Sequence, residues 1–259
     1  MIDITTPRCA LVTGAASGIG HAITEALRAT GTRVIAVDLH AGDITADLGT
    51  EAGRAAMAAQ AWRLTGGILD AVFACAGIRG GSAATLSVNY FGATATLNLL
   101  RPFLARSAAP RAVAIGSVAG YNQPDEPLIA ACLDGLEDEA RAMATERDEI
   151  VIYGTAKTAL THFCRAQSIR PDWAGKGILL NVIAPGLVET GLNRETFTDP
   201  RRRAAVAAMM PCPLNRHAQP EEIASLALYL GGAENTFVTG QVIYIDSGQE
   251  ALQRGAAAI

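Results

Sequence analysis

Short, continuous runs of apolar residues recur along the chain, and longer stretches with helical periodicity separate them. Because the apolar residues are consecutive rather than alternating, each run predicts a strand that is covered on both faces. Parallel strands joined by crossover helices meet that requirement, so the pattern predicts an α/β fold with a doubly wound parallel sheet. No repeat and no linker rich in proline or serine interrupts it, which predicts a single domain over residues 1–259. The runs are CALVTG, RVIAVD, LDAVFACAG, RAVAIGSV, ILLNVIAPG and QVIYIDSG.

Two connections depart from the even spacing of these runs. The strand that ends at Asp38 is followed so soon by the sequence DITADLG that a bare loop is expected there. The interval between Ser117 and Tyr153 is too long, and it predicts a helical insertion over residues 120–150 that begins at Pro127. We expect one amphipathic helix there, which would serve as a lid or an interface element and which a glycine at position 135 weakens. Its apolar face is predicted from the helical spacing of Ile129, Cys132, Leu133, Leu136, Ala140 and Met143.

Composition and charge argue against several classes of protein. The net charge of −4 and the isoelectric point near 5.6, without a basic stripe, argue against binding to duplex nucleic acid. No apolar run is long enough to span a bilayer, and the first residues lack the order of a signal peptide, so a cytoplasmic protein is expected. The five cysteines are scattered without metal-ligand spacing, which predicts free thiols and no metal site.

A glycine-rich turn follows the first predicted strand, in the sequence LVTGAASGIGHAITEAL. Gly14, Gly18 and Gly20 allow a tight turn, a close approach of backbone to a pyrophosphate, and free N–H groups at the start of a helix. Asp38 lies 38 − 20 = 18 residues further on, at the end of the next strand, where a carboxylate can accept from both hydroxyls of an adenosine ribose. Because that carboxylate also repels the 2′-phosphate of NADP, these features predict a dinucleotide site that prefers NAD.

The sequence VIYGTAK places Tyr153 and Lys157 four positions apart, where an apolar, strand-like run gives way to a helical pattern. This spacing would put both side chains on one face of a helix. The same spacing is common in unrelated sequences. By itself it leaves open whether the pair is a catalytic acid/base couple or an aromatic residue near a solvated amine.

A series of motifs in order resembles the short-chain dehydrogenase/reductase family, a family of Rossmann-fold enzymes, over nearly the whole chain. The segment TGAASGIG resembles the family's cofactor turn, ACAG its segment after the fourth strand, and VNYFG its helix asparagine. GSVAG resembles its catalytic serine, YGTAK its tyrosine and lysine, and NVIAPGLVET its nicotinamide-side strand end. The resemblance implies an NAD-dependent enzyme that interconverts a secondary alcohol and a ketone by hydride transfer.

The resemblance implies catalytic roles for Ser117, Tyr153, Lys157 and Asn89. Tyr153 would be the acid/base, but a free phenol titrates near 10, so its phenolate must be stabilised by about 4 kcal/mol. Lys157 would add positive charge beside the oxidised nicotinamide and hold its ribose. Ser117 would donate a hydrogen bond to the substrate oxygen, and Asn89 would hold a water that links Lys157 to solvent.

Other residues are implied to surround the cofactor. On the adenosine side, Asp47 would accept from the adenine amine. On the nicotinamide side, the backbone of Val188 and the hydroxyl of Thr190 would orient the carboxamide, although a helix cap is an equally reasonable role for Thr190. The full implied set is Gly14, Ser17, Gly18, Ile19, Gly20, Asp38, Leu39, Asp47, Leu48, Ala76, Gly77, Tyr153, Lys157, Pro185, Gly186, Val188 and Thr190.

A substrate lid is expected over residues 189–217. Leu192, Met209 and Met210 would contact a small-molecule substrate there, together with Ser117 and Tyr153, because methionines suit a pocket that adapts to bulky ketones. The two methionines could equally well pack the lid itself. Phe197 and Leu214 are further apolar candidates of the same segment.

Two departures from the family pattern narrow the resemblance. Ser117 precedes Tyr153 by 153 − 117 = 36 residues, where about a dozen is usual, and Cys75 stands where an asparagine is typical. Both departures, and the missing second crossover helix, are shared by the bacterial 3α-hydroxysteroid dehydrogenase/carbonyl reductase type. The stretches ITADLGTEAGR and LSVNYFGATATLNLLRPFL and the acidic helical insert also resemble that type. That resemblance implies a hydroxysteroid-like or other bulky cyclic substrate and a homodimer instead of a tetramer. An aryl-alcohol dehydrogenase of the coniferyl type, or a non-catalytic cofactor-sensing protein, are the alternatives.

Overall fold

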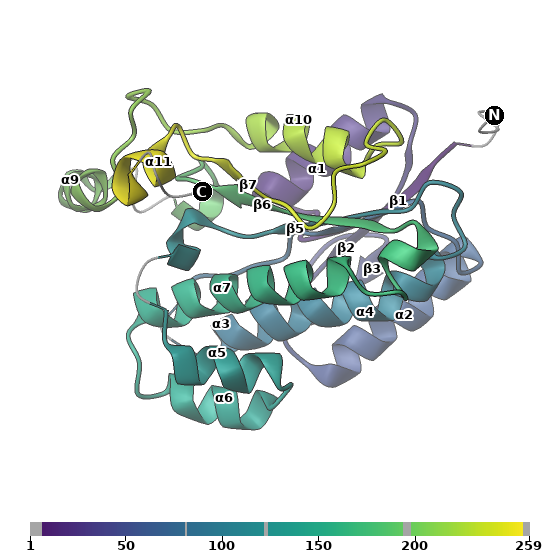
Figure 1. Ribbon diagram of the computed structural model, residues 1–259, viewed down its shortest axis with the longest axis horizontal. Coiled ribbons are helices and arrows are strands. Elements are labelled where there is room, and N and C mark those ends of the chain that lie inside the picture. Colours follow the sequence, from purple (N-terminus) through teal and green to yellow (C-terminus); the bar gives the residue numbers. More distant parts are fainter. Residues whose placement is uncertain (1–6, 81, 122–123, 194–197, 256–259) are drawn as a thin grey trace.

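A seven-stranded parallel sheet forms the middle layer of the computed structural model (Figure 1). The structure describes residues 7–80, 82–121, 124–193 and 198–255. The strand order is β3-β2-β1-β4-β5-β6-β7. Successive strands are therefore added toward one edge of the sheet from β1 to β3 and toward the other edge from β4 to β7. This is the doubly wound arrangement that the apolar runs predict. The strands are β1 Cys9–Thr13, β2 Arg33–Asp38, β3 Ile44–Thr45, β4 Ala71–Ala74, β5 Arg111–Ile115, β6 Leu179–Pro185 and β7 Val242–Ile245.

Helices cover both faces of the sheet (Figure 1). In that view α1 and α10 lie above the sheet, and α2, α4 and α7 lie below it. The helices are α1 Gly18–Ala29, α2 Glu51–Thr65, α3 Ala83–Leu86, α4 Ala93–Leu104, α5 Glu126–Leu133, α6 Glu137–Ala144, α7 Glu149–Ser168, α9 Pro200–Met209, α10 Pro220–Gly231 and α11 Gln249–Arg254. Shorter helical turns are η1 Ser87–Gly92, η2 Val118–Tyr121, η3 Ala174–Lys176 and η4 Gly191–Asn193.

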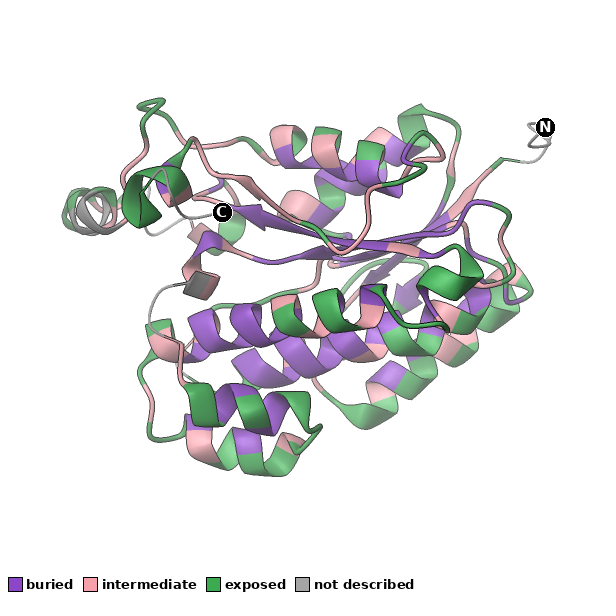
Figure 2. Cartoon of the chain, viewed as in Figure 1, coloured by how far each residue is buried: buried purple, intermediate pink, exposed green. Residues whose placement is uncertain are grey.

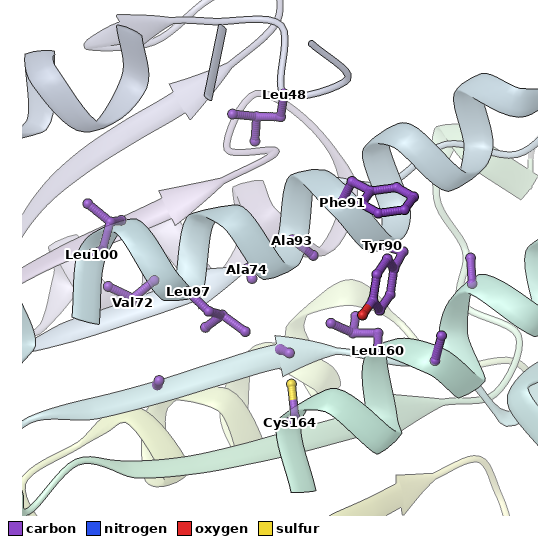
Figure 3. Packing of buried hydrophobic residues seen from close by; sticks show 14 of the residues in the cluster. Leu48, Val72, Ala74, Tyr90, Phe91, Ala93, Leu97, Leu100, Leu160 and Cys164 are labelled. Atoms are coloured by element: carbon purple, nitrogen blue, oxygen red, sulfur yellow. The ribbon is translucent and has the colours of Figure 1, made fainter. Parts of the chain in front are cut away.

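The apolar runs are buried because both faces of the sheet are covered. Every residue of β4 and β5 is buried, as Figure 2 shows for the centre of the sheet. On the lower face Leu97 of α4 and Leu160 of α7 belong to the same buried cluster as Val72 of β4 (Figure 3). Full burial of each such side chain contributes about 1.5–3 kcal/mol. The core therefore fixes two helices against the sheet: α7, which carries Tyr153 and Lys157, and α4, which directly follows the turn that carries Asn89.

The connection after β2 is a loop, as its length predicts, because β3 begins only a few residues after Asp38. The segment VIYGTAK differs from its expectation, since it lies wholly within α7 and has no strand-like part. Its apolar residues occupy the first turns of the helix, which begins after Asp148. Packing of α7 against α5 and β6 outweighs the preference of valine and isoleucine for strands.

The insertion contains two helices, α5 and α6, where the sequence predicts one. The first of them, α5, begins at Glu126, one residue before the predicted start at Pro127, and the carboxylate of Asp125 caps it by accepting from the N–H of Leu128 at 2.9 Å. Gly135, with φ of +76°, ends that helix in a conformation that favours glycine. Because the helical periodicity is broken there, Leu133 and Leu136 are exposed, although the sequence predicts them on the apolar face.

Candidate active site

A cavity of about 310 Å³ opens at the carboxyl ends of the strands. The residues that line it include Asp38, at the end of β2, and Leu192, in the segment after β6. Every residue that the resemblance assigns to the cofactor lies on its wall. These residues are Gly14, Ser17, Gly18, Ile19, Gly20, Asp38, Leu39, Asp47, Leu48, Ala76, Gly77, Tyr153, Lys157, Pro185, Gly186, Val188 and Thr190. A ligand that occupied the whole cavity would therefore contact all of them.

The glycine turn has no room for side chains. A Cβ on Gly20 would overlap the carbonyl oxygen of Gly14, and a Cβ on Gly14 would lie 2.9 Å from the Cα of Ala76. Gly14 and Gly18 have φ values of 68° and 53°, which L side chains rarely adopt. The backbone at the start of α1 is thereby open to the cavity. A pyrophosphate fits this cradle, because a helix N-terminus presents N–H donors and a positive dipole end.

The adenosine end of the cavity carries two carboxylates. Asp38 Oδ2 accepts from the N–H of Ala16 at 3.1 Å, and its Oδ1 accepts from the N–H of His40 at 3.1 Å. Asp47 Oδ1 accepts from the N–H of Gly49 at 2.9 Å. These backbone donors fix the orientation of both carboxylates while leaving lone pairs for further donors. The ends of β2 and β3 can thus accept hydrogen bonds from a ribose and an adenine.

Ser117 and Tyr153 both line the opposite end of the cavity, and the serine hydroxyl lies close enough to lower the pKa of the Tyr153 phenol. Ser117 follows β5, and Tyr153 lies in the second turn of α7. The insertion that separates them in sequence forms α5 and α6 and brings the chain back to the same sheet edge. Lys157, one turn after Tyr153, is 5 % exposed, and its Nζ donates to the carbonyl oxygen of Ile115 at 2.7 Å. Three of the four side chains predicted for catalysis therefore meet at the end of β5.

The positive charge near Tyr153 differs from the expectation. Burial raises the pKa of the Tyr153 phenol above its usual value, while the Arg79 guanidinium and the hydrogen bond with Ser117 oppose that rise. Arg79 lies over the Tyr153 ring at 5.5 Å from its centroid, and Lys157 Nζ lies 5.9 Å from it. Burial also lowers the pKa of Lys157 to about 8, which reduces the charge it can supply at alkaline pH. Arg79 is therefore a second cation beside the phenol, which the sequence analysis did not include.

Arg79 also joins two parts of the substrate end. It belongs to the loop after β4, and its Nη1 donates to Asn193 Oδ1 of η4 at 2.9 Å. Asn193 in turn donates from Nδ2 to the carbonyl oxygen of Val188 at 3.0 Å. A signal for Arg79 exists in the sequence, because it follows closely after a predicted strand and the carboxyl ends of parallel strands share one edge. Its pairing with Asn193 depends on the path of the segment after β6, which the sequence does not specify.

Asn89 lies in η1, a π-helical turn between α3 and α4, and it is fully buried. Its Oδ1 accepts from the N–H of Ile78 at 2.8 Å, and its Nδ2 donates to the carbonyl oxygen of Ile78 at 2.9 Å. The amide thus holds the loop after β4, behind Gly77 on the cavity wall. A π-helical turn often marks a functional position in a helix. The role of Asn89 in holding a water beside Lys157 stays a prediction.

Cys75 occupies the position where an asparagine is typical of the family, and Thr13 supplies hydrogen bonds there. The Thr13 hydroxyl accepts from the N–H groups of Cys75 and Ala76, at 3.0 and 3.1 Å. These bonds join the end of β1 to the segment after β4. Burial raises the pKa of the Cys75 thiol to about 12, so it is protonated at neutral pH. All five cysteines are free, as predicted.

The predicted substrate contacts are only partly brought together. Leu192 lines the main cavity and is 47 % exposed. Met210 lines a separate cavity of about 90 Å³, together with Leu214, and is not among the residues that line the main cavity. The side chain of Met209 and the whole of Phe197 lie outside the described residues.

No group of three or more histidine, cysteine, aspartate or glutamate side chains in the described part of the chain is arranged to hold a metal ion. Within the same residues, no helix is both long and apolar enough to cross a membrane.

Known proteins resemble the chain over almost its full length. A family model described as enoyl-(acyl carrier protein) reductase matches residues 14–250. A 3-alpha-hydroxysteroid dehydrogenase/carbonyl reductase of Comamonas testosteroni is 34% identical over 252 residues, which cover 94% of this chain and 97% of that protein.

Two solved structures also match the chain over almost its full length. The 3-alpha-hydroxysteroid dehydrogenase from Pseudomonas sp. B-0831, complexed with NADH, has a TM-score of 0.90 and 36% identity, covering 97% of this chain and 100% of that chain. The RhlG/NADP active-site complex of Pseudomonas aeruginosa has a TM-score of 0.77 and 29% identity, covering 95% and 97% of the two chains. These relatives share the parallel sheet that carries the cavity.

Proposed function

The chain belongs to the short-chain dehydrogenase/reductase family and is an oxidoreductase, and from this premise we propose that it uses NAD to interconvert a secondary alcohol and a ketone. One observation carries the proposal. Ser117, Tyr153 and Lys157 lie together at one end of a cavity whose other end has a glycine turn and Asp38. A dinucleotide spanning that cavity would present its nicotinamide to these three side chains.

The proposed chemistry needs a proton acceptor and a hydride acceptor. Bound NAD supplies the hydride acceptor. Tyr153 takes the hydroxyl proton of the alcohol during oxidation and returns it during carbonyl reduction. Ser117 donates a hydrogen bond to the substrate oxygen, where negative charge develops. Lys157 and Arg79 favour the phenolate of Tyr153, and Lys157 holds the nicotinamide ribose.

NAD is proposed over NADP because of Asp38. Its carboxylate faces the cavity at the end of β2, where a 2′-phosphate would meet a like charge. His40 is a basic residue on that part of the wall, and Arg33 lies at the opposite end of β2. The relative in complex with NADH supports the choice, whereas the relative in complex with NADP shows that the fold accepts either cofactor.

A hydroxysteroid-like or other bulky cyclic substrate is proposed, on the strength of the relatives' names and the apolar mouth of the cavity. Ile78 and Leu192 are exposed there, on two separate elements. Large apolar side chains at a cavity mouth favour a large apolar ligand. A homodimer in the cytoplasm is part of the same proposal, and it rests on the sequence resemblance alone.

A substrate panel tests the proposal. Hydroxysteroids, cyclic alcohols and aryl alcohols would each be assayed with NAD and with NADP by cofactor absorbance. We expect turnover with NAD and the highest kcat/KM among the hydroxysteroids or cyclic alcohols. Preference for aryl alcohols would favour the coniferyl-type alternative, and turnover only with NADP would contradict the role of Asp38. The absence of any turnover by a protein that binds NAD would favour the cofactor-sensing alternative.

A further inference from the structure

A buried arginine connects the adenosine end of the cavity to the helical insertion. Arg54, in the first turn of α2, is 8 % exposed. Its Nε donates to the carbonyl oxygen of Leu48 at 2.8 Å, and its Nη2 donates to that of Gly49 at 3.2 Å. Its two terminal nitrogens also donate to the two carboxylate oxygens of Glu137, at 2.7 and 2.6 Å. Glu137 is the first residue of α6, so one side chain joins α2, the segment before it, and the insertion.

The guanidinium of Arg54 depends on Glu137. A guanidinium does not lose its proton in proteins, so burial leaves it charged, and a buried charge is costly unless it is paired. A bidentate carboxylate fixes the plane of the guanidinium as well as compensating its charge. The orientation that Glu137 imposes is the one in which Nε and Nη2 reach the carbonyl oxygens of Leu48 and Gly49. Without Glu137, Arg54 would move toward water and release both carbonyl groups.

The segment that Arg54 holds forms part of the cavity wall. Asp47 and Leu48 line the cavity at its adenosine end. Two backbone N–H groups at this segment already have partners. The N–H of Gly49 donates to the Asp47 carboxylate, and the N–H of Thr50 donates to the Asp47 carbonyl oxygen at 3.2 Å. The backbone carbonyl groups of Leu48 and Gly49 are held by Arg54. Both sets of hydrogen bonds are required to keep the Asp47 carboxylate and the Leu48 side chain where an adenine would lie.

We propose that Glu137 is a positioning residue for the adenosine half of the dinucleotide, acting through Arg54 on Leu48 and Gly49. The insertion then contributes to cofactor affinity, in addition to covering the helices beneath it. This inference rests on the proposed function, because it takes Asp47 and Leu48 as the adenine contacts. It predicts an effect on any ligand that carries the adenosine diphosphate half, with or without a nicotinamide.

Binding of ADP-ribose to the full chain tests the proposal without requiring turnover. Glu137→Gln keeps the side-chain size but removes the charge and sets an amide NH₂ against the guanidinium. We expect the Kd for ADP-ribose, measured by calorimetry, to rise about tenfold, which corresponds to about 1.4 kcal/mol. The Kd for NAD should rise by the same factor. At saturating NAD, kcat should stay unchanged, because Tyr153 and Lys157 are held by other elements.

Two matched controls separate this effect from a general loosening of the insertion. Glu139→Gln makes the same change in the same helix at an exposed residue for which no contact with Arg54 is observed. Arg147→Gln removes the Arg147–Asp125 ion pair of 2.6 Å, which anchors the insertion at a different point. We expect both controls to bind ADP-ribose as the unchanged protein does.

Each outcome has a definite meaning. A change of less than twofold in Glu137→Gln, or an equal loss in Arg147→Gln, would overturn the proposal. If circular dichroism shows that Glu137→Gln is unfolded, Glu137→Asp takes its place, because it keeps the charge and withdraws the carboxylate by one methylene. A folded Glu137→Asp with unchanged affinity would then overturn it. Failure of the unchanged protein to bind ADP-ribose would contradict the proposed function instead, since no adenosine site would exist.

Discussion

The two ends of the cavity are built in different ways. At the cofactor end the wall is largely backbone, and glycine positions such as Gly14 and Gly20 are fixed by contacts that leave no room for a Cβ. At the substrate end the wall depends on side chains from separate loops, among them Arg79 and Asn193. A wall built of backbone can be predicted from a sequence, because only certain residue types permit it. A wall of side chains depends on which loops meet.

Substitutions at the cofactor end, where the wall is backbone, should have the largest effect on ligand binding. Replacing Gly20 by alanine would drive a methyl group into the Gly14 carbonyl oxygen, so the turn must shift. We expect the Kd for NAD, measured by fluorescence titration, to rise at least tenfold, which corresponds to about 1.4 kcal/mol. Gly191→Ala is the control, because a Cβ at this other cavity-lining glycine meets no atom within 4 Å. Equal losses in the two variants would show that the turn has no special constraint.

Changing Asp38 sharpens the same comparison by altering charge without altering backbone. Asp38→Ser removes the carboxylate that a 2′-phosphate would meet and keeps a hydroxyl that can bond to a ribose. We expect the ratio of kcat/KM for NAD to kcat/KM for NADP to fall by about tenfold, or about 1.4 kcal/mol. An unchanged ratio would mean that Asp38 does not face the adenosine ribose.

Arg79 tests whether a side-chain contact at the substrate end affects the chemistry. A cation favours the charged form of a phenol, so loss of Arg79 should raise the pKa of Tyr153 further. Alcohol oxidation requires the phenolate, and the acid limb of its kcat/KM profile should therefore move to higher pH in Arg79→Gln. We expect the shift toward higher pH to be largest at low ionic strength and to become smaller in high salt.

Two variants serve as controls for that shift. Arg79→Lys keeps the charge and should retain part of the effect. Arg28→Gln removes an exposed arginine of α1 and should leave the profile unchanged. A pH profile of Arg79→Gln that coincides with that of the unchanged protein would leave Arg79 with a structural role only.

The smallest effect is expected at Met210. Because its side chain lines the separate cavity, Met210→Ala should change kcat/KM for a bulky cyclic alcohol by less than threefold, or about 0.6 kcal/mol. Leu192→Ala, on the main cavity wall, should lower the same quantity more. A larger loss at Met210 than at Leu192 would place the substrate against the second cavity.

The sequence predicts the sheet and the glycine turn because each follows from residue types in order, whereas the meeting of Ser117 with Tyr153 is predicted only through the resemblance to the family. The break in the insertion was missed because Gly135 can either weaken a helix or end it, and only its left-handed conformation distinguishes the two. The strand-like start of VIYGTAK was wrong because packing overrides propensity. Arg54 gives no signal at all, since its partner Glu137 lies 137 − 54 = 83 residues away.

The central claim is that Tyr153 transfers the proton at a nicotinamide held by this cavity, and Tyr153→Phe tests it directly. The change removes the phenolic hydroxyl and leaves the ring beneath Arg79. With an alcohol that the unchanged protein oxidises, NAD reduction in the variant should fall at least a thousandfold, about 4 kcal/mol, while the Kd for NAD changes less than threefold. Turnover equal to that of the unchanged protein would contradict the account.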